Sequence, residues 1–217
     1  MLAAKRVLLT VWLCALSMNL MPLMAQDPYP DYDEDVFMGW DLEKNIATPV
    51  VEKSEKKAVA HYMKSIGESL AKKKYSVELM REGEVIIVSL PTDELFAPND
   101  TLISKRGVDL LTPLLQYMKE PYTFKILYTV NTDDTGSQRY LEQLSDQRNA
   151  SLYDWFMDQI DLGNMSEDIV LIPYSMGASM PVATNDDRKG RLKNRRVEIF
   201  IIPGPQLIDK ARHKTLK

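Results

Sequence analysis

The sequence of 217 residues is poor in the side chains that most often carry catalysis, because it has one cysteine and two histidines. The single cysteine, Cys14, lies in an apolar stretch near the N-terminus and excludes an intramolecular disulfide. The histidines are His61, in a predicted helix, and His213, in the C-terminal tail, so neither a Ser-His-Asp triad nor a histidine-rich metal site can be assembled. A glycine-rich phosphate loop is also missing. We therefore expect a protein without catalysis, metal or cofactor.

Neighbouring carboxylates are the remaining feature that an enzyme could use. A glycosidase needs two carboxylates that flank the bond to be cleaved. The chain has such pairs at Asp133–Asp134 and Asp186–Asp187. Adjacent carboxylates in turns are usually solvated, so these pairs favour an enzyme only weakly.

Positive charge is not in excess. The formal net charge is −4, and it becomes −6 without Lys5 and Arg6. Nucleic-acid binders usually carry the opposite sign. Basic residues do cluster at 188–196 and 210–217, but no aromatic residues that could stack on bases lie between them. The sequence therefore predicts no nucleic-acid partner.

Residues 1–25 are predicted to be a signal peptide. A lysine and an arginine at positions 5 and 6 precede the apolar run Val7–Leu16, and the small residue Ala25 ends a plausible cleavage site. Two alternatives stay open. One is an uncleaved anchor formed by Val7–Ala25, and the other is a lipoprotein modified at Cys14, although Leu13 before it does not fit a lipobox.

Residues 26–50 are predicted to be an acidic, flexible linker, because acids and prolines occur there without hydrophobic periodicity. The aromatic residues of this stretch offer a second reading, in which it docks on a partner. Residues 51–82 are predicted to form a helix and the first strand of a hairpin. The helix is indicated by apolar residues at helical spacing, namely Val59, Met63, Ile66 and Leu70.

Three apolar stretches, at 124–129, 169–172 and 197–202, predict three strands that form the tightest part of the core. Residues 104–120 have the pattern of a helix packed on a sheet, in which Pro113 either kinks the helix or starts a new one. Helices are expected over one face of the sheet. The alternation of strands and helices predicts an α+β or α/β sandwich.

The stretch Asn131–Arg148 predicts a binding pocket for a zwitterion. Asp133 follows a buried strand at 122–130, where a carboxylate can accept an ammonium group. Ser145 is predicted to be the N-cap of a helix, which would place Arg148 in its first turn and let its planar guanidinium hold a carboxylate. The alternative is a purely structural role, in which Asp133 caps its own turn and Arg148 pairs with an acid such as Asp134.

Several motifs together resemble the OmpA-like domain family. They are T-D-x-T-G-S from Thr132, L-S-x-x-R ending at Arg148, G-R-L-K-N-R-R-V-E from Gly190, and L-P-x-D-x-L-F from Leu90. The resemblance covers roughly Val85–Ile202. It implies a βαβαβ sandwich with a mixed sheet, and we assign residues 83–204 to this domain and residues 205–217 to a basic C-terminal tail.

The resemblance also implies a function and a set of site residues. In the family, residues that match Asp133 and Arg148 hold the diaminopimelate of the peptidoglycan stem peptide. We expect Thr132 and Asn131 to add polar groups to this pocket and Arg195 to support it. The chain would then bind peptidoglycan without catalysis in the periplasm, associated with the outer membrane, and its N-terminal segment would contact outer-membrane protein partners.

The chain departs from the family pattern at three places. Val130-Asn131 stands where Gly-His is usual, Leu141 replaces an asparagine, and Asn149 replaces an alanine. The departures at Val130, Asn131 and Leu141 motivate the competing hypothesis of an OmpA-like scaffold protein with a degenerate pocket. A cell-wall hydrolase is a third reading, for which no catalytic pair is found.

Overall fold

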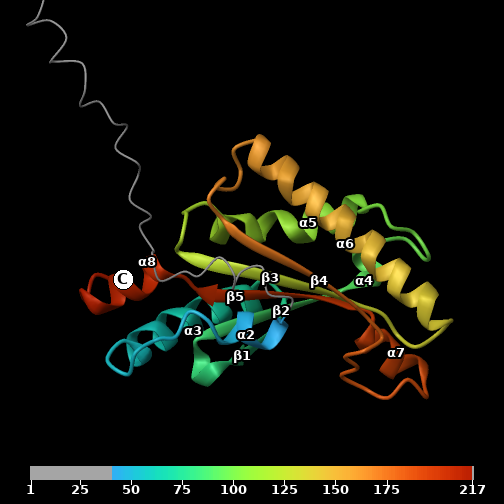
Figure 1. Cartoon of the computed structure of the whole chain (residues 1–217), viewed down its shortest axis with the longest axis horizontal. Coiled ribbons are helices and arrows are strands. Elements are labelled where there is room, and N and C mark those ends of the chain that lie inside the picture. Colours follow the sequence, from blue (N-terminus) through green and yellow to red (C-terminus); the bar gives the residue numbers. More distant parts are fainter. Residues whose placement is uncertain (1–40, 217) are drawn as a thin grey trace, which may run out of the picture. The chain divides into compact units, whose positions relative to one another are not determined.

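The computed structural model describes residues 41–216, which contain a single five-stranded sheet with helices packed on it (Figure 1). The predicted signal peptide and residues 26–40 of the predicted linker lie outside the described residues. Within the described part of the chain, no helix is both long and apolar enough to span a bilayer.

The sheet is mixed, with the strand order β1-β2-β5-β3-β4. Only β3 and β4 are parallel neighbours, joined by a long helix, and the other three pairs are antiparallel. The strands are β1 (Ser76–Met80), β2 (Val85–Pro91), β3 (Phe124–Asn131), β4 (Val170–Gly177) and β5 (Arg196–Pro203). The three predicted strands are present as β3, β4 and β5, but β4 is a partly buried edge strand, and the interior strands of the sheet are β2, β5 and β3. In chain order β3, β4 and β5 alternate with helices, so the predicted βαβαβ fold with a mixed sheet is confirmed.

The larger helices cover one face of the sheet, as predicted. They are α3 (Lys56–Lys72), α5 (Lys105–Leu111), the 3₁₀ segment η2 (Thr112–Met118), α6 (Gln138–Asp161) and α8 (Pro205–Arg212). Their apolar sides meet alternate residues of the strands in one core, where Tyr128 and Phe156 pack with ring centroids 5.5 Å apart. Each fully buried side chain of this kind stabilises the fold by roughly 1.5–3 kcal/mol. The short segments η1 (Arg81–Gly83), α4 (Thr92–Leu95) and α7 (Arg188–Asn194) connect the strands.

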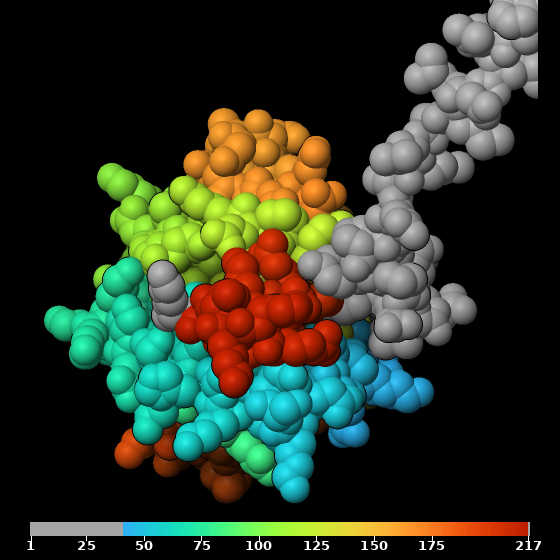
Figure 2. Space-filling view, turned by 90° about the vertical axis from the view of Figure 1, so that its left-hand side faces the viewer, coloured from blue at the N-terminus to red at the C-terminus, as the bar shows by residue number. Residues whose placement is uncertain are grey.

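Two helices differ from the sequence prediction in ways that have physical causes. The predicted basic tail is helix α8, which buries Leu207, Ile208 and Ala211 and packs beside α3 (Figure 2). Its basic residues are not among the buried ones, so composition alone predicted only a basic tail. Around Pro113 the α-helix passes into the 3₁₀ segment η2, with the proline in its first turn, where a missing N–H costs least.

The opposite face of the sheet carries a smaller apolar cluster that is covered by α2 (Leu42–Ala47). Leu42 and Ile46 pack there against residues of β2, β3, β4 and β5. Residues 42–47 were predicted to belong to a flexible linker, and for them the prediction is wrong. Asp41 caps α2 by accepting a hydrogen bond from the Lys44 amide at 3.1 Å, a local signal that the acidic composition concealed.

Polar tethers hold α2 on the sheet. Lys125 of β3 is 1% exposed, and its Nζ donates to the Asn45 carbonyl at 2.8 Å and to the Thr48 carbonyl at 3.1 Å. Arg81 donates to the carbonyl of Ile46 at 2.9 Å and to that of Pro49 at 3.0 Å. These cations satisfy carbonyl groups at the C-terminal end of α2, where the helix dipole favours positive charge.

Candidate functional site

The candidate site lies where β3 ends. Asp133 is 7% exposed, and its Oδ1 accepts a hydrogen bond from the Thr135 amide at 2.9 Å. The preceding Thr132 amide donates to the Gly177 carbonyl at 2.8 Å, which fastens the chain after β3 to the end of β4. Gly177 has φ of +51°, a left-handed conformation that favours glycine. The carboxylate is thus fixed by the turn that follows the strand, which agrees with the structural alternative that Asp133 caps its own turn.

Arg148 reaches the site from the middle of α6. This helix begins after Ser137, whose Oγ accepts from the Tyr140 amide at 3.3 Å, so the prediction of an N-cap at Ser145 is wrong. The first turns of α6 are mostly polar and exposed, which hid its start from the hydrophobic pattern. Ser145 is buried, and its Oγ accepts from the Gly177 amide at 3.2 Å. Arg148 therefore owes its position to packing and not to the dipole of a helix N-terminus.

The guanidinium of Arg148 is held on one side and open on the other. The residue is 5% exposed, its Nε donates to the Asp100 carbonyl at 3.0 Å, and its Cζ lies 5.0 Å from the centre of the Phe96 ring. Neither Nη atom has a hydrogen-bond partner among residues 41–216. Burial lowers the pKa of Arg148 from its usual value, although the group stays protonated. A buried cation with two free N–H₂ groups is suited to an anionic ligand.

Arg195 links two carboxylates of the site. Its Nη1 donates to Asp133 Oδ2 at 2.6 Å, and its Nε and Nη2 donate to the two oxygens of Asp93 at 2.9 and 2.7 Å. The hydrogen bond from Arg195 outweighs burial and lowers the pKa of Asp93. Burial acts to raise the pKa of Asp133, but the hydrogen bonds from Thr135 and Arg195 together lower it. Both acids are therefore ionised at neutral pH.

Asp93 was not among the predicted site residues, although its signal was present. It is the acid of the L-P-x-D-x-L-F motif, and Phe96 of the same motif lies under Arg148. Asp93 also lies close enough to Arg148 to affect its pKa. The site thus contains two carboxylates and two guanidinium groups, from Asp93, Asp133, Arg148 and Arg195.

The structure brings together some of the other predicted residues. Thr132 is next to Asp133, and its buried Oγ1 has no hydrogen-bond partner in the described part of the chain. Asn131 does not join the cluster, because its Nδ2 donates to Thr129 Oγ1 at 2.9 Å, on the face of the sheet opposite α6. No ion pair or hydrogen bond joins Asp133 to Arg148 within residues 41–216, and Asp134 pairs with neither. A ligand could therefore meet a negative group at Asp133 and a separate positive group at Arg148.

The acidic side chains of the site do not form a metal-ligand cluster. Among residues 41–216, no group of three or more histidine, cysteine or acidic side chains is arranged to hold a metal ion. The two acids of the site are bridged by Arg195, which already neutralises part of their charge.

Comparison with known proteins supports the assignment of the fold. No family model matches the chain. The protein named "Probable lipoprotein YiaD" from Escherichia coli is 27% identical over 128 residues, covering 58% of this chain and 56% of the relative. "Outer membrane protein A" from Bordetella avium is 29% identical over 111 residues, covering 51% of this chain and 54% of the relative. The chain therefore spans about half the length of the curated relatives that it matches.

A solved structure gives independent evidence for the same architecture. A MotB-like protein from Desulfovibrio vulgaris superposes with a TM-score of 0.58 at 18% sequence identity, over 68% of this chain and 94% of the other. At this level of identity the likeness shows a shared fold.

Proposed function

We propose that this chain, which carries an OmpA-like domain, binds peptidoglycan non-covalently and without catalysis and so ties an envelope complex to the cell wall. The proposal is supported by relatives named as an outer-membrane protein and a lipoprotein. It places the protein in the periplasm, associated with the outer membrane. Its ligand is the diaminopimelate side chain of a stem peptide, and partners of the outer membrane contact its N-terminal segment.

The observation that carries the proposal is the half-satisfied guanidinium of Arg148. A ligand carboxylate can accept two parallel hydrogen bonds from such a group, a geometry that a lysine cannot offer. The Asp100 carbonyl and the Phe96 ring fix the plane of the guanidinium before the ligand arrives. Because the side chain is already ordered, little conformational entropy is lost on binding.

The ammonium group of the ligand is proposed to bind Asp133. Both carboxylate oxygens already accept a hydrogen bond, Oδ1 from Thr135 and Oδ2 from Arg195. An ionised carboxylate can accept about four, so room for the ammonium remains. Asp93 holds Arg195 through two hydrogen bonds, which keeps this arginine from swinging into the space of the ligand. We assign Arg195 and Asp93 the role of positioning Asp133.

A scaffold protein with a degenerate pocket is the second candidate. One observation favours it, since Leu141, which stands in place of an asparagine, is buried and offers no hydrogen bond to a ligand. Such a protein would keep the fold and lose the affinity for the wall.

Sedimentation with purified diaminopimelate-type peptidoglycan distinguishes these functions. Asp133→Asn and Arg148→Gln each remove a charge with little change of shape. Each charge-assisted hydrogen bond contributes about 1.5–3 kcal/mol, so each variant should bind roughly 10- to 100-fold more weakly. The matched control is Arg139→Gln, on the exposed side of α6. Thermal melts establish that all variants are folded. The proposal is refuted if the wild type does not bind, or if the two site variants bind as well as the control.

A further inference from the structure

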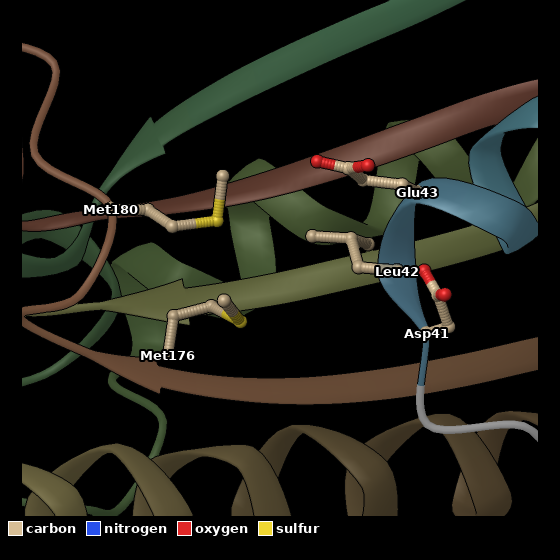
Figure 3. Close-up of a pocket in the computed structure, with 5 residues that line it drawn as sticks. All are labelled: Asp41, Leu42, Glu43, Met176 and Met180. Atoms are coloured by element: carbon tan, nitrogen blue, oxygen red, sulfur yellow. The ribbon is translucent and has the colours of Figure 1, made fainter.

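A groove lies on the face of the sheet opposite the large helices, between α2 and the loop that follows β4 (Figure 3). It has a volume of about 630 Å³, within the range of ligand pockets, and it is open to solvent. Its lining residues are Asp41, Leu42, Glu43, Met176 and Met180. Leu42 points toward the two methionines, which come from the far side of the groove.

The α2 wall of the groove is firmly attached to the sheet. Asn45, in the middle of α2, is fully buried and donates to the Tyr174 hydroxyl at 2.6 Å. The same residue accepts from Lys125, and Arg81 binds the carbonyl groups that follow. These contacts hold α2 on the side that faces the sheet, while its N-terminal turn stays at the surface. The groove is thus a formed feature and not a gap beside a loose segment.

The opposite wall is adaptable and apolar. Met180 is 44% exposed, and the nearby Val182 is 59% exposed. Methionine side chains are flexible and polarizable, so they fit apolar partners of varied shape. Arg196 donates to the Met180 carbonyl at 3.1 Å, which fixes the backbone of this loop while leaving its side chain free.

The charge at the groove is negative. Asp41 and Glu43 are the charged residues of its lining, and both are acidic. Asp41 has one weak ion pair, with the exposed Lys44 at 3.8 Å, and Glu43 has none among the described residues. Arg196, the nearby cation, is paired with Glu198 at 2.9 Å and adds no net positive charge. An occupant with an aliphatic side chain beside a lysine or arginine therefore matches this groove.

We propose that this groove binds a cationic, aliphatic segment of a partner protein. A second copy of the chain is a poorer occupant, because a symmetric contact would bring Asp41 and Glu43 against their own counterparts. Met176 is followed by Gly177, whose carbonyl holds Thr132 beside the candidate site, so the groove and the site flank the same strand ends on opposite faces. Both can be occupied at once, and binding in the groove does not require binding to the wall.

The test uses the full chain labelled with ¹³C at the methionine methyl groups. Two probes are titrated, a twelve-residue peptide of alternating lysine and leucine and its glutamate–leucine counterpart. We expect the lysine peptide to shift the methyl signals of Met176 and Met180, assigned through Met→Leu variants, and to leave that of the buried Met63 unchanged. We expect the glutamate peptide to shift none of them.

Charge-neutral variants sharpen the result. Asp41→Asn keeps a residue that can cap the helix. Combined with Glu43→Gln in one variant, called the rim variant, it should weaken binding of the lysine peptide roughly fivefold, since exposed ion pairs are individually modest. The matched control, Glu68→Gln with Glu78→Gln, removes two exposed acids elsewhere and should bind like the wild type. The proposal is overturned by equal binding of both peptides, by unchanged methionine signals, by unchanged affinity of the rim variant, or by self-association of the chain through this face.

Discussion

Lys125 makes the stability of the protein depend on pH in a way that can be measured. Burial, and to a smaller degree the charge of Arg81, lowers the pKa of Lys125 from 10.5 to about 8. Below pH 8 the lysine is protonated in both the folded and the unfolded state. Between about pH 8 and pH 10.5 the folded protein has released this proton while the unfolded chain still holds it. Because the unfolded state then binds more protons, the free energy of unfolding rises with pH through this window.

The size of the effect follows from the shift. A depression from 10.5 to about 8 corresponds to roughly 3 kcal/mol of added stability at the upper end of the window. The variant Lys125→Met keeps the length of the side chain and removes its charge. The difference in stability between wild type and variant should therefore grow by a few kcal/mol in favour of the wild type as the pH rises. Tyrosines that titrate at high pH are present in both proteins and cancel in this difference.

Urea denaturation followed by circular dichroism at about pH 7, 9 and 10.5 measures this difference. Lys64→Met, on the exposed side of α3, is the control and should follow the wild type at a constant offset. A difference between wild type and Lys125→Met that stays flat across the window would refute the reasoning, because it would mean that the pKa of Lys125 is not lowered in the folded protein. At neutral pH the variant should also exchange the amide hydrogens of α2 faster, since two carbonyl groups at the end of that helix lose their donor.

Three further predictions concern the loop before β5 and the pocket. Asn194→Ala should lower the free energy of unfolding by about 2–4 kcal/mol in urea denaturation, because this fully buried amide makes four hydrogen bonds to the loop at 182–185; an unchanged midpoint would contradict this. Gly190→Ala should lower the melting temperature by several degrees, because its new Cβ would overlap the Thr184 carbonyl, whereas Gly163→Ala has open space around it and is strained only by its backbone angle. Leu141→Asn should strengthen peptidoglycan sedimentation several-fold if the pocket is a zwitterion site, and should leave it unchanged if the chain is a scaffold.

The sheet could be predicted well from the sequence because each strand has its own run of apolar residues. The strand at 124–131 is buried along its whole length, and its apolar run is visible without knowledge of its neighbours. Lys125 is the only charged residue within it. Its partners, Asn45 and Thr48, lie far away in the sequence, so nothing near Lys125 shows that this cation is buried under a helix.

The candidate site could be predicted only in part for a similar reason. Asp133 follows directly from the end of a strand and a turn motif, and the motif spacing pointed to Arg148. The start of α6 was misplaced because its first turns lack apolar periodicity, although Gly136 and Ser137 give a turn and a cap at the true boundary. Asp93 joins Asp133 through Arg195, and such a bridge between distant segments is a tertiary contact that periodicity cannot reveal.

The position of β3 has a mechanical consequence. Lys125, which contacts the C-terminal end of α2, lies near the beginning of this strand, and Asp133 follows its end, so a force applied between these two points would run along the strand axis. β3 has hydrogen-bonded neighbours on both sides, β5 and β4. A force along such a strand shears all of these hydrogen bonds together, whereas a force across an edge strand would open them one after another. β3 is therefore better suited than an edge strand to carry tension along its own axis.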